Sequence, residues 1–489
     1  MTDYIAIDLG TTNVKTAVYD DTFELKGIKG LTVEYDRANG YCEFDIEVYC
    51  GLVFRTIAEF IDEGVIGKGS VSRIILTGQA ESLIVLDEDM KPLMNAISWM
   101  DERSLDECEF LKSVFSFEEY YGKTGQTSII PTWPATKILW LKNNHPEIYA
   151  EIKYYVLLKD YVAYRLTGVL SADRSIATFS FYFDIWDKCY WPEMCEALGV
   201  STTQLPPLIE PCTDIGPLTP GAAALCGLSE TTIVNNGTLD HFTGMIGVGN
   251  IEPGTISLST GTVMALATMT MASDVKAGTM ALHYGFLPDT YVYIMVSESG
   301  GSSLEWYRDQ FLPEMSFEQI NDRLKTKDIS DDVLFLPYVV GVNSPEYDNK
   351  ASGLFFGLRA KHDRLDLAYS VMEGVAILLA KNVDALLGEG LPVKKVIATG
   401  GGAKSNLWCG LQADATGIPI QIPRDKEASC LGAVIIGTVA DKTFTDYKAA
   451  VDKAVGFEKT FQSNPNEKLK LKRKQFDLLY DAMIEAARL

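Results

Sequence analysis

Two segments far apart in the chain share one local pattern, and this pattern constrains the fold more than any other feature. Residues 4–20 read YIAIDLGTTNVKTAVYD, and residues 254–270 read GTISLSTGTVMALATMT. Each segment predicts a strand, a Gly/Thr turn at Gly10-Thr11 or Gly261-Thr262, and a second strand. One supersecondary unit in each half indicates two domains with similar cores. The alternative is two unrelated hairpins with a common turn composition.

The length of the chain also favours two domains. The chain has 489 residues, whereas a single hydrophobic core rarely grows beyond roughly 250–300 residues. We therefore expect an N-terminal domain over 1–245 and a C-terminal domain over 246–489. Between the two hairpins, predicted strands alternate with helical periodicity, which is typical of α/β layers. The clearest further elements are strands in 72–79 and 231–240 and helices in 134–144, 158–168, 303–312, 366–387 and 429–440.

Charge and cysteine content narrow the class of partner. The net charge of -23 repels phosphate backbones and anionic lipid, so we expect neither nucleic acid nor a membrane as a partner. A nucleotide site must then rely on local backbone N–H groups and Mg²⁺. The nine cysteines include no C-x-x-C pair, which indicates reduced thiols and a cytoplasmic protein. The chain begins directly with a strand-like run, so we expect no signal peptide.

The first hairpin carries a candidate phosphate and metal site. Asp8 closes an apolar strand and is followed by Gly10, Thr11 and Thr12. Glycine lets the backbone approach a phosphate, and the N–H and hydroxyl groups that follow can donate to its oxygens. A carboxylate beside such a turn suits Mg²⁺, which prefers oxygen ligands. The alternative is a plain tight turn, although the repeated Gly/Thr turn in the second hairpin favours a polyphosphate.

A glycine-rich turn follows a β-branched strand near residue 400 and opens a helix. It contains Gly401, Gly402, Ala403 and Asn406. A helix N-terminus with glycines allows close approach of a flat or anionic ligand. The spacing matches neither G-x-G-x-x-G nor the G-x-x-x-x-G-K-[ST] loop, so a Rossmann or Walker-type site is not predicted. An ordinary strand–helix turn is the alternative.

Asp240 is the candidate catalytic base. It follows the predicted strand TTIVNNGTL and precedes His241. In phosphoryl transfer to a hydroxyl, an aspartate accepts the proton while backbone donors and Mg²⁺ hold the phosphate. On sequence alone, a helix N-cap is the competing interpretation of Asp240.

These motifs occur in an order that resembles the FGGY carbohydrate kinases. Asp8–Thr12 and Gly261-Thr262 resemble the two phosphate motifs of the family, and Gly401–Asn406 resembles its adenosine motif. The segment GLFFGL at 353–358, continuing through Glu373, matches the C-terminal signature. The segment PATKILWL at 134–141 resembles the N-terminal signature, with Thr132 departing from the usual aromatic or small residue.

The resemblance implies an actin- or hexokinase-like fold of two ribonuclease-H-like domains around a central cleft. Sugar would bind mainly to the N-terminal domain and ATP mainly to the C-terminal domain. It places Asp240 on the catalytic base and Asp8, with Asp240, near Mg²⁺. Gly301 and Glu305 fall on positions that contact the nucleotide. Dimers are common in the family, so a homodimer is compatible with the resemblance.

The sugar pocket departs from both familiar patterns within the family. Gln79-Ala80-Glu81-Ser82 stands where xylulokinases carry Gln-Met-His-Gly and glycerol kinases carry Gln-Arg-Glu-Thr. In ISWMDERS (97–104), Trp99 and Asp101 are closer to the xylulokinase pattern. The predicted substrate-binding residues are Gln79, Glu81, Trp99, Asp101, Asp240 and His241.

The resemblance therefore predicts an ATP- and Mg²⁺-dependent kinase for a hydroxyl of a small neutral sugar, with a xylulose-like ketopentose as the leading substrate. Glu81 can accept two hydroxyls of a polyol but repels an anion such as gluconate. A glycerol- or erythritol-type polyol kinase and a gluconate kinase remain alternatives within the family. An actin-like chaperone or filament ATPase is the alternative from another class.

Overall fold

The computed structural model describes residues 2–38, 40–275, 280–341, 343–346, 348, 350–464 and 467–489. The chain forms two compact units. The first contains Met1–Ile251, Ala281–Val292 and Glu427–Val455, and the second contains Glu252–Met280, Tyr293–Lys426 and Gly456–Leu489. The units are thus interleaved along the sequence, whereas the division of the chain into functional domains at residue 245 stays a prediction.

A six-stranded sheet forms the centre of the first unit, in the order β13-β14-β5-β1-β2-β3. β1 pairs antiparallel with β2 and parallel with β5, and β5 pairs parallel with β14. The first predicted hairpin is therefore confirmed. The strands are β1 (Asp3–Leu9), β2 (Asn13–Asp20), β3 (Leu25–Thr32), β5 (Val71–Gly78), β13 (Asp214–Pro217) and β14 (Ile233–Leu239).

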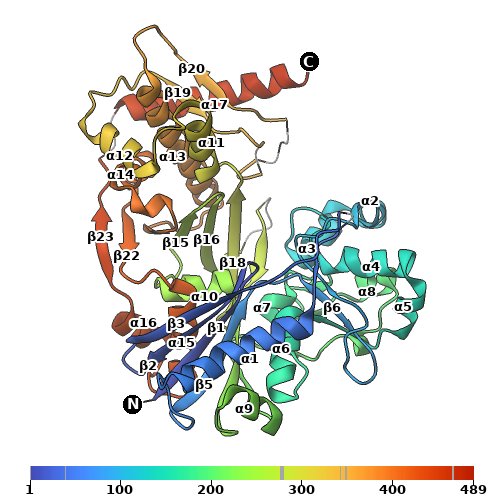
Figure 1. Ribbon diagram of the computed structural model, residues 1–489. Helices are drawn as coiled ribbons and strands as arrows, with labels where there is room; N and C mark the ends of the chain where they lie inside the picture. The colour runs from blue at the N-terminus through green and yellow to red at the C-terminus, as the bar shows by residue number, and fades with distance from the viewer. Residues whose placement is uncertain are drawn as a thin grey trace. The chain divides into compact units, whose positions relative to one another are not determined.

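Helices cover both faces of this sheet (Figure 1). On one face lie α1 (Ile46–Asp62), α6 (Leu158–Thr167) and α9 (Pro220–Cys226), and on the other lie α10 (Asp240–Gly247) and α15 (Ala428–Ala440). Alternate residues of β1 therefore enter different cores, and Tyr4 to Ile7 are all fully buried. A strand covered on both faces reads as a continuous apolar run, which explains the sequence YIAI.

Close packing of α10 against α15 explains why residues 427–455 belong to the first unit. A Cβ added to Gly247 would lie 1.8 Å from the carbonyl oxygen of Ala428. A Cβ added to Gly432 would lie 1.8 Å from the carbonyl oxygen of Thr243. The two helices touch backbone to backbone at these glycines, so the prediction that the small-residue helix at 429–440 packs closely is confirmed.

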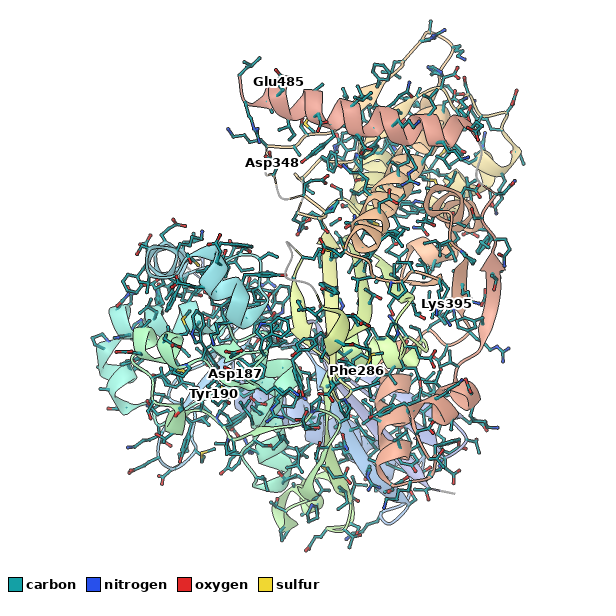
Figure 2. All side chains as sticks on the ribbon, turned by 180° about the vertical axis from the view of Figure 1, so that it is seen from behind. Asp187, Tyr190, Phe286, Asp348, Lys395 and Glu485 are labelled. Atoms are coloured by element: carbon teal, nitrogen blue, oxygen red, sulfur yellow. The ribbon has the colours of Figure 1, made fainter. Side chains whose placement is uncertain are left out.

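The remaining elements of the first unit form small sheets and peripheral helices. A four-stranded sheet has the order β4-β7-β6-β8, with β4 (Glu43–Phe44), β6 (Leu83–Leu86), β7 (Ala96–Ile97) and β8 (Tyr154–Leu157). The two-stranded sheets are formed by β9 (Ala172–Asp173), β10 (Phe183–Asp184), β11 (Cys189–Tyr190) and β12 (Leu208–Ile209). Figure 2 labels Asp187 and Tyr190 at the β10–β11 hairpin. The helices are α2 (Leu105–Val114), α3 (Phe117–Thr124), α4 (Pro134–Asn144), α5 (Pro146–Glu151), α7 (Arg174–Ala177), α8 (Pro192–Leu198), the 3₁₀ helix η1 (Thr202–Gln204) and α16 (Tyr447–Ala454).

The second unit has a central sheet with the same plan. Its order is β18-β16-β15-β21-β22-β23. β15 pairs antiparallel with β16 and parallel with β21, as β1 does with β2 and β5. The second predicted hairpin is thus confirmed. The strands are β15 (Thr255–Thr260), β16 (Met264–Met271), β18 (Thr290–Ser297), β21 (Lys395–Thr399), β22 (Ile420–Pro423) and β23 (Phe457–Phe461). β17 (Leu282–Tyr284) belongs to the first unit.

The other elements of the second unit surround this sheet. They are η2 (Ala272–Asp274), α11 (Gly301–Phe311), α12 (Phe317–Thr326), β19 (Leu334–Leu336), β20 (Leu354–Phe356), α13 (Arg364–Gly388), η3 (Gly402–Lys404), α14 (Asn406–Thr416) and α17 (Glu467–Ala487). Asp348 and Glu485, the latter on α17, are labelled in Figure 2. None of the helices described is both long and apolar enough to cross a membrane.

Candidate active site

The first candidate site lies where three parallel strands of the first unit end side by side. Asp8 of β1 is in register with Thr77 of β5, and Thr77 is in register with Thr238 of β14. Because parallel strands end at the same edge of a sheet, residues that follow these ends gather there. Asp8, Gln79 and Asp240, which sequence analysis singled out separately, are brought to this one edge.

Asp240 occupies the first turn of α10. The helix begins at Asp240 and Leu239 is its N-cap residue, so the interpretation of Asp240 as an N-cap is wrong. The backbone N–H of His241 donates to Asp240 Oδ1 at 2.6 Å. Burial raises the pKa of Asp240, and the nearby His241, whose own side chain is exposed, opposes this. Asp240 is thus a carboxylate with increased proton affinity, as a general base needs.

Asp8 shares the electrostatic environment of Asp240. Burial and, to a smaller extent, the charge of Asp240 raise the pKa of Asp8 to about 7, although Lys15 acts to lower it. Lys15 is itself paired with Glu427, with 2.8 Å between Nζ and Oε2. Neither Asp8 nor Asp240 forms an ion pair with a basic side chain among the residues described. A bound cation would therefore stabilise the ionised forms of these two neighbouring carboxylates.

These carboxylates fit a magnesium ion that is bound together with a ligand. Within the described ranges, no cluster of three or more His, Cys, Asp and Glu side chains could hold a metal. Mg²⁺ usually takes one or two carboxylates and completes its shell with water and substrate phosphates. Asp8 and Asp240 supply that number of carboxylates and no more.

The β1–β2 turn holds the predicted phosphate-binding residues. A Cβ on Gly10 would lie 2.7 Å from the carbonyl oxygen of Asn13, so the turn requires glycine. Tyr49 Oη donates to the Gly10 carbonyl oxygen at 3.0 Å. Trp99 Nε1 donates to Thr11 Oγ1 at 2.9 Å, while Thr12 is exposed. The turn is therefore anchored from two sides, and Trp99 links the predicted phosphate and sugar residues.

Glu81 lies in a tight turn after β5 with an unusual backbone. Its φ of 58° is in the left-handed region, which is uncommon for a residue other than glycine. Burial raises the pKa of Glu81 to about 8, with Lys137 lowering it and Asp240 raising it. Burial lowers the pKa of Lys137 to about 7. Strained backbone at a partly buried ionisable side chain is typical of a functional site.

Gln79 offers a free donor beside this turn. It is 6% exposed, and its Nε2 has no hydrogen-bond partner among the described residues. Its Oε1 accepts from Ser82 Oγ at 2.7 Å, and Ser82 Oγ accepts from the Trp99 N–H at 3.2 Å. A buried amide donor without a partner is costly, so it points to a bound polar ligand.

Asp101 differs from the other predicted substrate residues because its carboxylate is already engaged. It is fully buried and accepts two bonds from the guanidinium of Arg103, each at 2.7 Å. It also accepts the backbone N–H of Cys42 at 2.5 Å. Direct contact of Asp101 with a sugar stays a prediction, whereas the contacts described here hold the loop that carries Trp99.

The second unit contains a pocket of about 680 Å³. It is lined by Gly261, Thr262, Gly301, Glu305, Gly401, Gly402 and Asn406. These are the nucleotide-binding residues predicted for this unit, except Ala403, which does not line it. The remaining lining residues are Thr260, Leu304, Phe317, Glu318, Asn321, Asp322, Lys325, Lys404, Ser405 and Trp408.

Glycines allow the three segments around this pocket to touch. The Gly301 N–H donates to the Gly261 carbonyl oxygen at 2.8 Å, and a Cβ on Gly301 would lie 2.2 Å from that oxygen. Gly400 has a φ of 79°, and a Cβ there would lie 2.9 Å from the Thr260 carbonyl oxygen. A Cβ on Gly402 would lie 2.8 Å from Thr260 Cβ. The hairpin turn, the start of α11 and the glycine-rich turn thus form one wall.

Several residues of both sites were not predicted from the sequence. Lys137 appeared only within a signature segment, and a buried lysine in an amphipathic helix gives no further signal. Phe317, Asn321 and Lys325 of α12 line the pocket, yet their spacing reads as the surface of an ordinary helix. The serine that caps α14, Ser405, donates to Asn321 Oδ1, which ties α12 to the glycine-rich turn.

Comparison with known proteins relates both sites to one family. Residues 3–247 match the N-terminal domain, and residues 254–440 the C-terminal domain, of the FGGY family of carbohydrate kinases. Over 456 residues the chain is 28% identical to the xylulose kinase of Bacillus subtilis (strain 168), covering 92% of this chain and 91% of that protein.

Solved structures show the same fold at lower identity. The xylulose kinase of Rhodospirillum rubrum has a TM-score of 0.91 at 23% identity and covers 100% of both chains. The glycerol kinase of Plasmodium falciparum, solved with ADP, has a TM-score of 0.89 at 21% identity, covering 100% of this chain and 99% of that chain. The predicted α/β fold of two actin- or hexokinase-like domains is thereby confirmed.

Proposed function

The chain belongs to the FGGY family of carbohydrate kinases and is a sugar kinase, a family membership that implies ATP as the donor; on this premise, we propose that its acceptor is a neutral ketopentose resembling xylulose. The observation that carries the proposal is the cluster of Asp8, Asp240 and Glu81 at one sheet edge. The charge of Asp240 raises the pKa of both Asp8 and Glu81, so the three carboxylates share one environment.

Asp240 is the general base in this proposal. As the acceptor oxygen attacks the γ-phosphorus, Asp240 takes the hydroxyl proton, the bond from phosphorus to the ADP oxygen breaks, and a phosphate monoester forms. Asp8 and Asp240 would hold Mg²⁺, which neutralises charge on the transferring phosphoryl group. Gly10, Thr11 and Thr12 would donate to phosphate oxygens, and the pocket lined by Gly261, Gly301 and Gly402 would hold the adenosine part.

A neutral sugar suits the predicted sugar-binding residues of the first unit better than an acid does. Gln79 Nε2 is a free donor for a sugar oxygen, and the partly exposed indole of Trp99 offers an apolar face to the carbons of a sugar. A gluconate carboxylate would approach Asp8 and Asp240, and the like charges of the ionised aspartates would repel it strongly in a partly buried site. Similarity to xylulose kinases favours a ketopentose over glycerol or erythritol.

An ADP-release assay over a panel of sugars tests the substrate. We expect turnover to be stimulated most by a ketopentose such as xylulose or ribulose, less by glycerol and erythritol, and least by gluconate. Subtraction of the rate without sugar separates phosphoryl transfer to sugar from hydrolysis of ATP. Highest kcat/KM with gluconate, or no stimulation by any neutral sugar, would contradict the proposal.

The rate should depend on pH through the two aspartates. Because Asp8 and Asp240 must be ionised and burial raises both pKa values, to about 7 for Asp8, kcat/KM should fall as the pH decreases below about 7. Excess Mg²⁺ should shift this decline to lower pH, because bound metal favours the ionised ligand. Initial rates at constant ionic strength measure both effects, and a rate that stays constant down to about pH 5 excludes the assignment.

Glu81 should contribute to sugar recognition. A hydrogen bond to a charged group contributes about 1.5–3 kcal/mol, and the pKa of Glu81 is about 8. Above that pH, where Glu81 is ionised, Glu81→Gln should therefore lower kcat/KM for the sugar by about tenfold or more. The KM for ATP should not change. Glu88→Gln is the matched control, because Glu88 is an exposed carboxylate in the same segment. Equal kcat/KM values for the two variants would show that Glu81 does not take part in sugar recognition.

A further inference from the structure

A buried polar network contacts the C-terminal end of β14, and none of its residues has a role in the proposed reaction. Its charged members are Lys159, in the first turn of α6, and Asp173, the N-cap residue of α7. Each is 2% exposed, and Lys159 Nζ donates to Asp173 Oδ2. A buried ion pair is weak evidence for stability, because desolvation of both charges offsets their attraction. The pair therefore calls for another explanation.

The network is attached to the strand that carries Asp240. Lys159 Nζ also donates to the backbone carbonyl oxygen of Asn236 in β14. Asp173 Oδ1 accepts from Ser175 Oγ and from the N–H of Ile176, the latter at 3.1 Å. Ser175 Oγ is 2.6 Å from Thr238 Oγ1. The ion pair is thus joined to β14 at Asn236 and, through Ser175, at Thr238. Thr238 lies two residues before Asp240.

The contact is made where β14 is irregular. The register with β5 shifts between Asn235 and Thr238. Gly237 has a φ of 53°, and a Cβ there would lie 1.8 Å from the Leu76 carbonyl oxygen. The extra residue of a bulge leaves backbone groups unpaired and redirects the side chains that follow. Lys159 satisfies one of these carbonyls, and Ser175 fixes the threonine directly after the glycine.

We propose that Lys159, Asp173 and Ser175 are positioning residues, which lock the bulged end of β14 through Asn236 and Thr238 and thereby orient the Asp240 carboxylate toward the acceptor hydroxyl. The inference rests on the proposed role of Asp240 as the base. A second set of contacts holds Asp240 itself: Thr77 Oγ1 is 2.7 Å from Thr243 Oγ1, and Thr243 Oγ1 donates to the Asp240 carbonyl oxygen at 2.9 Å. The backbone of Asp240 is thus held by Thr77 of β5 through Thr243, and the network of α6 and α7 holds the residues of β14 that precede Asp240.

Thr238 allows a clean test, because valine has the shape of threonine without the hydroxyl. A small misplacement of a catalytic group can lower the rate up to about 10²-fold. We expect Thr238→Val to lower kcat about tenfold while the KM values for ATP and sugar stay within about twofold. Thr238→Ser keeps the hydroxyl and should recover most of kcat.

The matched control is Thr232→Val, just before the other end of β14. Thr232 is also fully buried, and its hydroxyl donates to the Val71 carbonyl oxygen at 3.2 Å. Its loss should lower the melting temperature about as much as Thr238→Val does, but it should leave kcat unchanged. This comparison separates loss of a buried hydroxyl from loss of the link to Ser175.

The double substitution Lys159→Met and Asp173→Asn removes both charges of the ion pair together. We expect a folded protein with ADP binding unchanged and kcat lowered at least about tenfold. ADP binding, measured by calorimetry, reports on the pocket of the second unit and so monitors folding independently of activity.

The outcomes distinguish this inference from the proposed function. A fully active Asp240→Asn variant overturns the assignment of the base, and with it the inference. If Asp240→Asn is inactive while Thr238→Val and Thr232→Val have the same kcat, only the positioning network is overturned. A selective kcat loss in Thr238→Val that Thr238→Ser restores supports it.

Discussion

Asp240→Asn should lower kcat for sugar phosphorylation at least about 10²-fold, because general base catalysis contributes about 10²–10⁴-fold and the amide cannot take the hydroxyl proton. Asparagine has the same shape, so the bond from the His241 N–H can be kept by the amide oxygen. ADP should bind as in the wild type, since the pocket that would hold it is built from residues of the second unit.

The same variant should be more stable than the wild type at higher pH. Burial raises the pKa of Asp240 in the folded chain. Between the unfolded and the folded pKa, the unfolded chain has released this proton and the folded chain has not, so stability falls as pH rises. Asparagine removes this effect. The melting temperature of Asp240→Asn should therefore exceed that of the wild type at about pH 8, and the difference should be smallest near pH 4.

Asp187→Asn is the control for this pair of measurements. Asp187, labelled in Figure 2, also belongs to the first unit, and its side chain is 70% exposed. Its loss should change neither kcat nor the pH dependence of the melting temperature. If Asp240→Asn turns over within tenfold of the wild type, Asp240 is not the base.

The two central hairpins and their glycine turns could be predicted from the sequence because they depend on local chain properties. Alternating apolar strands around a Gly/Thr turn predict a hairpin wherever it occurs, and glycine is needed at Gly10 for a steric reason within the same turn. The interleaving of the two units could not be predicted in this way. It depends on α15 packing against α10 through Gly247 and Gly432, which are far apart in the sequence.

The candidate site could be predicted only in part, because the sequence does not reveal which charges are paired. In the sequence, Glu81 and Asp101 are both predicted substrate-binding carboxylates, and nothing distinguishes them. In the structure, the Asp101 carboxylate accepts hydrogen bonds from Arg103 and from the Cys42 N–H. Burial instead raises the pKa of Glu81. The network of Lys159 and Asp173 was missed for the same reason, since its members become neighbours only through the fold.

The nucleotide pocket depends on a backbone contact that tolerates no side chain. The Gly301 N–H donates to the Gly261 carbonyl oxygen at 2.8 Å, and the next N–H, of Ser302, donates to the Thr262 carbonyl oxygen at 2.9 Å. A Cβ on Gly301 would lie 2.2 Å from the Gly261 oxygen. The three nearest atoms all belong to the backbone of Gly261 and Thr262. A methyl group at Gly301 must therefore displace either α11 or the hairpin turn, and both line the pocket.

Gly301→Ala should therefore weaken nucleotide binding strongly. Overpacking of a close contact costs about 1–3 kcal/mol, which corresponds to roughly 5- to 150-fold in affinity. We expect the Kd for ADP, measured by calorimetry, and the KM for ATP to rise within this range. Sugar should still raise the melting temperature of this variant as it does for the wild type, because the predicted sugar-binding residues lie in the first unit and are unchanged.

Gly410→Ala is the matched control, because it adds the same methyl group to a helix of the same unit. Gly410 lies in α14, and a Cβ there meets no atom within 4 Å. Alanine in a helix interior is more favourable than glycine by about 0.5–1 kcal/mol, so this variant should be slightly more stable with unchanged ADP affinity. If Gly301→Ala binds ADP as Gly410→Ala does, the wall formed by the hairpin turn and α11 does not contact the nucleotide, and the site must lie elsewhere in the fold.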